Sequence, residues 1–401
     1  MTDPGRPEPD PGDDPFAKLP LFGDLARLLG QQGGLNWEAA RQLALSVAAG
    51  GTSEANVDPL ERIRYQELCR IAELHLTDVT RLASPGDRRL QVAPVNRSTW
   101  AHSALGDYRQ LFERLATSLG RGTDATAFGA DPADAADPFS AMLGGLMKMV
   151  GPMMLSMTAG SMVGHLARQA MGTYHLPLPR PGGTDVQVVV PNVAAFAEEW
   201  SLDQDDLRLW VILSELSHHL VLDIPHVRTR LNSMLESYVE GFEPDATALE
   251  DKLGSFDPSM MGDPSGLQKM FTDPELLLGA VRSPGQKALL PRLDALVSVI
   301  VGYVDHVMDV TTGRLLGTGG RLSEAVRRSR VEASDSDRFV ERLLGLELTQ
   351  AAYDRGSAFV DGVLERGGDE GLARLWENER TLPTPAEVDA PGLWLARLEF
   401  D

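Results

Sequence analysis

The segment WVILSELSHHLVLDIPHV, residues 210–227, is the most informative stretch of this sequence. Its apolar side chains recur at the three- and four-residue spacing of a helix, and polar side chains interrupt the apolar run at its centre. Pro225 lacks a backbone donor and marks the position where such a helix ends. The stretch therefore predicts a buried helix from about Leu207 to Leu222 that carries the polar residues 214–218 inside an apolar environment.

Residues 214–218 read Ser-Glu-Leu-Ser-His, one residue short of the HExxH pattern. In HExxH, two imidazoles one helical turn apart bind a zinc ion, and the glutamate activates the zinc-bound water. Glu215 stands at the position of this general base and His218 at that of the second ligand, but Ser214 replaces the first. Because a neutral hydroxyl is a poor zinc ligand, the spacing alone favours a buried polar pair over a metal site.

A third ligand would have to come from a second helix, and VSVIVGYVDHVMD, residues 297–309, is the candidate. Asp305 and His306 lie in the middle of this apolar run. In one class of zincins the second helix reads ExxxD, where the glutamate binds zinc and the aspartate hydrogen-bonds a ligand histidine. Asp305 fits the aspartate, whereas Val301, four residues earlier, cannot bind a metal.

Several short motifs occur together in one order along the chain. They are GSMVGHLARQAMGTYHLPLPRP (160–181), LSELSHHLVLDIPHVRTRL (213–231), GYVDHVMD (302–309), LSEAVRRSR (322–330) and LLGLEL (343–348). In these motifs the chain resembles an actinobacterial family of zincin-like proteins that are described as zinc-dependent metalloproteases or hydrolases. The resemblance spans about residue 15 to the C-terminus. It implies a mainly α (α+β) zincin-like metalloprotease fold with one small β element.

Carried over by position, the resemblance implies that Glu215 is the general base, His218 an imidazole ligand and Asp305 a supporting carboxylate. In the family the second helix carries glutamate at the position of Val301, and members vary at the position of Ser214. This chain departs at both positions, so two of the three ligands are replaced. The resemblance then implies a degenerate zinc site without a cofactor, in a non-catalytic pseudoprotease that binds a protein or peptide partner.

An altered ligand set is the alternative hypothesis. His219 lies four residues after Glu215, and His226, Asp305 and His306 could approach the same point. Imidazole and carboxylate groups suit zinc or a related divalent ion. On this hypothesis the chain is an active zinc-dependent metallopeptidase or hydrolase with Glu215 as its general base, so the sequence leaves its status as an enzyme open.

Composition divides the chain into three parts. Residues 1–14 are a proline-rich acidic tail typical of disorder, residues 15–138 form an N-terminal helical region that ends in an acidic loop, and residues 139–401 form the zincin-like helical domain. Val186 to Val190 is the strongest strand signal, bounded by Gly-Gly and Pro-Asn. A free edge there could accept an extended partner peptide by strand addition.

Charge, cysteine content and hydropathy limit the partners and the compartment. The chain has 58 acidic against 37 basic side chains, a net charge of −21, which repels phosphate backbones and argues against nucleic acid. Cys69 is the single cysteine, which fits a cytoplasmic protein, and we expect it in the core. Residues 141–167 are long and apolar, but Lys148 and Pro152 interrupt them, so two buried helices are favoured over a membrane span.

Overall fold

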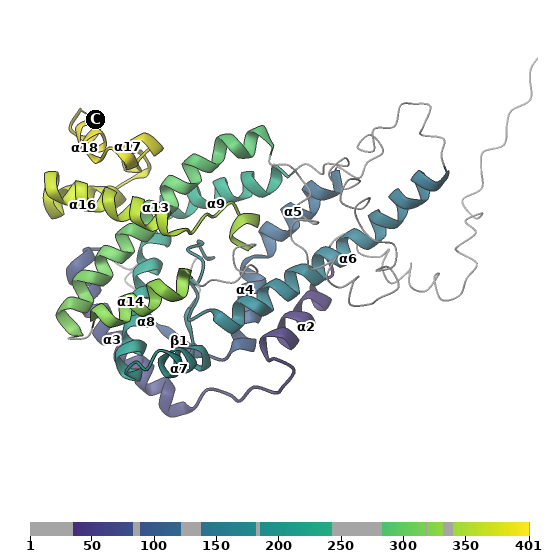
Figure 1. Cartoon of the computed structure of the whole chain (residues 1–401), viewed down its shortest axis with the longest axis horizontal. Helices are drawn as coiled ribbons and strands as arrows, with labels where there is room; N and C mark the ends of the chain where they lie inside the picture. Colours follow the sequence, from purple (N-terminus) through teal and green to yellow (C-terminus); the bar gives the residue numbers. More distant parts are fainter. Residues whose placement is uncertain are drawn as a thin grey trace, which may run out of the picture.

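A computed structural model describes residues 35–82, 89–121, 138–181, 185–242, 283–316, 319–331 and 340–400. Across these ranges the protein is mainly helical with one small sheet, as the sequence predicts (Figure 1). The tail at residues 1–14 and most of the acidic loop before Pro138 lie outside the described residues. The division of the chain at residue 138 stays a prediction.

The helices of the described chain follow one another in a fixed order. They are α2 (Trp37–Ala48), α3 (Pro59–Thr80), α4 (Arg97–Asp107), α5 (Arg109–Arg121), α6 (Pro138–Gln169), α7 (Val190–Glu199), α8 (Gln204–Leu222), α9 (Pro225–Glu240), α13 (Pro284–Leu315), α14 (Gly319–Val331), α16 (Gln350–Ala373), α17 (Pro385–Asp389) and α18 (Pro391–Phe400). Helix α8 has the predicted end at Leu222, and Pro225 opens the next helix rather than a loop.

The sheet contains two parallel strands, β1 (Val92–Val95) and β2 (Val186–Val189), with Val92 opposite Val186. Strand β1 was not predicted, because VAPV is short and contains a proline. The other edge of β2 is occupied as well, since Thr173 N donates to Gln187 O at 3.0 Å and Val189 N donates to Met171 O at 2.8 Å. The predicted free edge at residues 186–190 is therefore wrong, and Val190 already belongs to α7.

Helix α6 is one continuous helix, so the prediction of two helices in this segment is wrong. Pro152 removes a single backbone donor, and the helix runs on across it. The small residues of the segment serve helix packing, because a Cβ at Gly160 would lie 2.3 Å from the carbonyl oxygen of Ala40 in α2, and one at Gly164 would lie 2.6 Å from Val47 Cβ. Within the described ranges, no helix combines the length and the hydropathy needed to cross a membrane.

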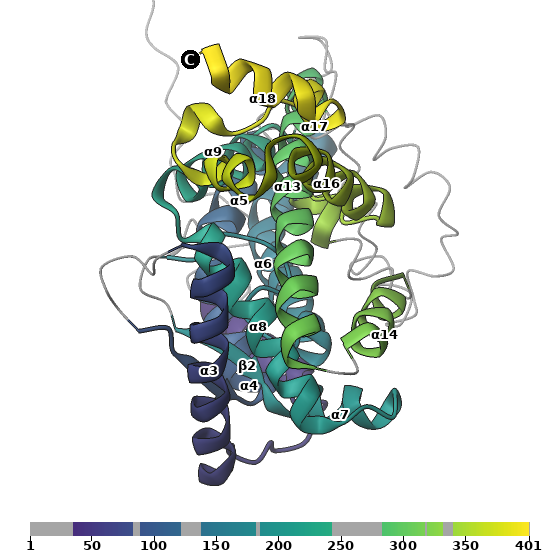
Figure 2. The same cartoon turned by 90° about the vertical axis from the view of Figure 1, so that its left-hand side faces the viewer.

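Helices α8 and α13 lie side by side at the centre of the molecule (Figure 2). Almost every side chain of α8 from Leu207 to Leu222 is buried, and so is most of α13 between Leu293 and Met308. Neighbours surround both helices, with α3 and α7 packed against α8 and with α9 and α16 packed against α13. The polar residues 214–218 are thus fixed within a rigid core.

Helices α13 and α16 cross at backbone contact. A Cβ at Gly302 would lie 2.2 Å from the carbonyl carbon of Gly356, and one at Gly356 would lie 1.9 Å from the carbonyl oxygen of Ser298. No side chain fits at either position unless the helices separate. The absence of two side chains therefore sets the distance between the two longest helices in the C-terminal half.

Replacing Gly302 by alanine should lower the free energy of unfolding by about 1–3 kcal/mol or more, because the added methyl group must displace backbone atoms. The matched control is Gly313→Ala in the same helix, where a Cβ meets nothing within 4 Å. This control should be neutral or stabilise by up to about 1 kcal/mol. Urea unfolding measures both, and equal stabilities would contradict the close crossing.

Candidate functional site

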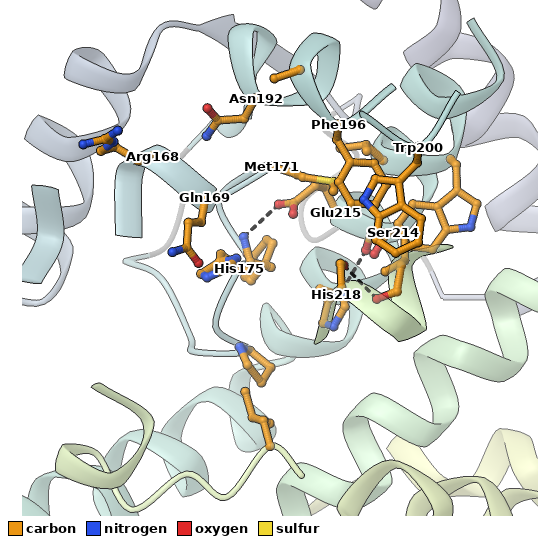
Figure 3. Close-up of a pocket in the computed structure, with 18 of the residues that line it drawn as sticks. Arg168, Gln169, Met171, His175, Asn192, Phe196, Trp200, Ser214, Glu215 and His218 are labelled. Atoms are coloured by element: carbon orange, nitrogen blue, oxygen red, sulfur yellow. Dashed lines mark hydrogen bonds between the residues drawn. The ribbon is translucent and has the colours of Figure 1, made fainter. Parts of the chain in front are cut away.

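A cavity of about 460 Å³ lies beside the central helix α8. Its first wall is one face of α8, formed by Trp210, Val211, Ser214, Glu215 and His218 (Figure 3). These residues are separated by one, three or four positions, so they project from the same side of the helix. The predicted residues Ser214, Glu215 and His218 are therefore brought together at one cavity.

The second wall is one face of α7, and it carries Asn192, Ala195, Phe196 and Glu199 at the i, i+3, i+4 and i+7 positions of the helix. Strand β2 leads directly into this helix, so the sheet fixes where the wall begins. The segment that leaves α6 forms a third side, and residues of α14 and of 341–353 complete the lining. The cavity thus lies between segments that are far apart in the sequence.

Glu215 is buried, with 5% of its surface exposed. Its Oε2 accepts a hydrogen bond from Tyr174 N at 2.8 Å. A Cβ at Gly172 would lie 2.3 Å from the carboxyl carbon of Glu215, so the carboxyl group fills the space where a side chain of residue 172 would be. This position accepts only glycine while Glu215 keeps its place.

Burial raises the pKa of Glu215 to about 8. The backbone hydrogen bond from Tyr174 is the largest opposing effect, followed by the charge of Arg180 and the Thr173 backbone, and these do not cancel the loss of hydration. The side chain is therefore mostly a neutral acid at pH 7. A protonated carboxyl group cannot accept a proton from water, so at neutral pH only the ionised minority of Glu215 could act as a base.

The imidazole of His218 is oriented by its own helix. Its Nδ1 lies 2.8 Å from the carbonyl oxygen of Ser214, so Nδ1 carries the proton and donates to that oxygen. The ring stacks on Tyr174 with 6.0 Å between ring centroids and 13° between planes. His218 thus has its Nδ1 bonded within α8, and its ring lines the cavity.

The other histidines proposed as ligands do not line this cavity. The Nδ1 of His219 lies 2.9 Å from the hydroxyl of Tyr174, and burial lowers the pKa of His219. His226 lies in the first turn of α9, where burial also lowers its pKa. The hydrogen bond to Tyr174 thus holds His219 away from a shared site with Glu215.

The second helix contributes no ligand to the cavity. Val301 is 1% exposed within α13, and Asp305 and His306 also lie outside the cavity lining. Burial lowers the pKa of His306, opposed mainly by the nearby Asp361 of α16, so this imidazole lies toward α16. In the described part of the chain, no group of three or more His, Cys, Asp or Glu side chains is arranged to hold a metal ion.

Arg180, which the sequence did not single out, holds in place the turn that contacts Glu215. This buried guanidinium donates to Asp107 Oδ2 at 3.0 Å, to the Tyr108 hydroxyl at 2.9 Å and to the carbonyl oxygen of Thr173, and it lies 4.6 Å over the Tyr108 ring. It therefore anchors the turn whose next residue, Tyr174, holds Glu215. No sequence pattern indicates this role, because Asp107 and Arg180 are 73 positions apart.

Trp100 fixes the same turn from another direction. Its indole Nε1 donates to the carbonyl oxygen of Gly172 at 2.8 Å, and the ring is 1% exposed.

Cys69 is buried, as predicted, and Arg327 and Arg328 pair with Glu324 on an exposed helix face. None of these last three lines the cavity.

The model of a family of zincin-like metallopeptidases matches residues 35–395, most of the chain. This chain belongs to the zincin-like metallopeptidase family. A crystal structure from Chloroflexus aurantiacus, described as "a putative hydrolase with a novel fold", is similar to this zincin-like protein with a TM-score of 0.62. The two share 23% sequence identity, and the match covers 92% of this chain and 99% of that chain. The likeness shows a shared fold. The family match confirms the zincin-like part of the resemblance carried by the motifs.

The donors of this zincin-like protein do not fit the zinc site that its family implies. A catalytic zinc ion in this class takes three protein ligands and keeps one position for water. The cavity lining offers the imidazoles of His218 and His175, the carboxyl of Glu215 and the neutral hydroxyl of Ser214, and Val301 has no donor atom. Among the residues that the structure describes, no three His, Cys, Asp or Glu side chains are grouped to hold a metal ion.

The raised pKa of Glu215 predicts a pH-dependent stability. A carboxyl whose folded pKa lies above its unfolded value stabilises the fold below about pH 4.5, and this contribution is lost as the pH rises to about 8. Over that window the free energy of unfolding should fall on the order of 1 kcal/mol per pH unit because of this group.

Glu215→Gln should remove this part of the slope, and urea unfolding between pH 5 and pH 8 measures it. Glu198→Gln, an exposed acid on α7, is the control and should keep the slope of the unmodified protein. Parallel curves for all three proteins would show that Glu215 is ionised in the folded state.

Proposed function

We propose that this zincin-like protein is a non-catalytic member of its family that binds a peptide segment of a partner in the cavity between α7 and α8. The observation that carries the proposal is the motif on α8, where His218 keeps the imidazole of one ligand position and Ser214 occupies the other. Ser214 and Val301 stand where ligands would be required. Metal-dependent peptide hydrolysis needs a full ligand set, and the residues that the structure describes group no three His, Cys, Asp or Glu side chains to provide one.

Loss of the metal leaves a binding cavity with a defined shape. A volume of about 460 Å³ is within the range of about 300–1,000 Å³ of pockets that hold small ligands. Phe196, Trp200, Trp210 and Tyr353 give it aromatic surface, and Phe196 and Trp200 stack with centroids 5.7 Å apart. Rigid aromatic side chains beside a few polar groups are typical of surfaces that bind peptides. A single buried cysteine is compatible with action in the cytoplasm.

The competing function is metal-dependent peptide hydrolysis by an altered ligand set. Its support is membership of the family and the retention of Glu215 and His218 at their motif positions. The two functions differ in the metal content of the purified protein, which is measurable without knowing a substrate.

Protein purified from zinc-supplemented cells should contain far less than one zinc per chain by elemental analysis, and a chelator should leave its melting temperature unchanged. The physical reason is that the described donors at the cavity fall short of the three protein ligands that hold a catalytic zinc ion. His218→Ala should not alter the metal content, nor should His165→Ala, an exposed histidine on α6. Stoichiometric zinc that disappears only in His218→Ala would overturn the non-catalytic function.

Peptide binding can be tested with a fluorescent pool of random hexapeptides that have free carboxyl ends. Ala195→Trp should abolish binding in fluorescence anisotropy, because Ala195 is exposed and lines the cavity, so an indole would fill it. Glu198→Trp, on the same helix but outside the cavity lining, should bind the pool like the unmodified protein. Absence of binding by the unmodified protein would refute the proposed function.

A further inference from the structure

Two arginines stand at one end of the cavity. Arg97 is the first residue of α4, directly after β1, and Arg168 lies in the last turn of α6. Both line the cavity, and within the described ranges neither guanidinium forms an ion pair with a carboxylate. In a chain with a net charge of −21, two cations without acidic partners at a cavity are a distinctive feature.

Asn192 links Arg97 to the C-terminal end of α6, the helix that carries Arg168. Its Oδ1 accepts from Arg97 Nε at 2.6 Å, while its Nδ2 donates to the carbonyl oxygens of Ala167 at 2.9 Å and Ala170 at 2.6 Å. These two carbonyls bracket Arg168 in the sequence. The buried Asn192 therefore fixes Arg97 at the end of α6 and leaves the two terminal nitrogens of its guanidinium for another partner.

Aromatic rings begin one helical turn away on the same face of α7. Phe196 follows Asn192 by four residues, a rise of about 6 Å along the helix. Phe196 stacks with Trp200, and Figure 3 shows Arg168 and Asn192 on one side of Glu215 and these two rings on the other. A separation of this size matches the reach of a single amino acid from its carboxylate to the end of a large side chain.

We propose that the cavity recognises the C-terminal end of a polypeptide, with the terminal carboxylate bound by Arg97 and Arg168 and the last side chain packed on Phe196 and Trp200. Arginine binds a carboxylate through paired N–H donors, which makes it a specific partner for this group. A chain end places a carboxylate and a side chain on one residue, so a single residue satisfies both ends of the site. This inference rests on the proposed peptide-binding function and names what is bound.

The test compares one hexapeptide pool in two chemical forms, with a free carboxylate and with a C-terminal amide. The free-acid pool should bind at least about tenfold more tightly in anisotropy titrations, since the amide removes the charge that the arginines meet. Arg97→Gln and Arg168→Gln should each reduce this preference, while Arg97→Lys should retain part of it. Arg62→Gln, an exposed arginine on α3, is the matched control and should change nothing.

Two further arms identify the source of the carboxylate. An amidated pool with glutamate at its last position should bind no better than the plain amide, because its side-chain carboxylate is separated from the aromatic rings. N-acetylphenylalanine, which carries a carboxylate and a large side chain on one residue, should compete with the free-acid pool, and its amide should not. Tighter binding of the glutamate amide than of the free-acid pool, or equal competition by N-acetylphenylalanine and its amide, would overturn recognition of a chain end.

The outcomes separate this inference from the function on which it rests. If acid and amide pools bind equally and Ala195→Trp abolishes both, the cavity binds peptides and recognition of the chain end is wrong. If the acid preference survives in both glutamine variants, the arginines are not the recognition site. If neither pool binds, the proposed function and this inference both fail.

Discussion

The buried guanidinium of Arg180 is the interaction on which the candidate site depends. It ties Asp107 and Tyr108, at the junction of α4 and α5, to the carbonyl oxygen of Thr173. Burying a cation is costly unless it is paired and hydrogen-bonded, and here a carboxylate, a hydroxyl and a carbonyl share its donors. The short segment after α6 is thereby held against α8, and its next residue, Tyr174, forms the contacts that position Glu215, His218 and His219.

Although Arg180 lies close enough to lower the pKa of Glu215, burial of the carboxyl has the larger effect. The guanidinium of Arg180 donates its hydrogen bonds to Asp107, Tyr108 and Thr173 and none of these to Glu215. The Glu215 carboxyl group is therefore mostly neutral at pH 7. A metal ion beside Glu215 would reverse this balance, because a divalent charge favours the ionised carboxylate. The protonation state of Glu215 and the number of metal ligands are thus linked properties of one site.

The sequence predicted the parts of the fold that depend on local patterns. The buried helix at residues 207–222, the strand at 186–189 and the cluster of Ser214, Glu215 and His218 follow from periodicity and motif spacing. The zincin-like fold itself was predicted from the family resemblance, because residue spacing predicts single helices and strands but not how they pack together. The parts that were missed depend on contacts between distant segments.

Strand β1 has too short a pattern to be recognised without its partner β2, and the segment at 171–173 becomes an edge neighbour of β2 only in three dimensions. Helix α6 continues through Pro152 because packing against α2 outweighs the loss of one backbone hydrogen bond. No sequence pattern links Arg97 to the end of α6 near Arg168. The link is Asn192, far along the chain, which bonds the Arg97 side chain and the backbone carbonyl of Ala167. The altered ligand set stays a prediction. Spacing did not indicate the contact between His219 and Tyr174, because those residues are far apart in the sequence.

The pairing of β1 with β2 also constrains how the protein is made. Residue 95 leaves the ribosome 94 positions before residue 189, and synthesis of that interval takes about 5–20 s at about 5–20 residues per second. During this time the apolar face of β1 has no partner strand, and α3 lacks α8, the helix on which it packs. Until the middle of the chain has been synthesised, apolar surface of the N-terminal helices stays exposed to solvent. During this interval nascent molecules are open to aggregation and to binding by chaperones.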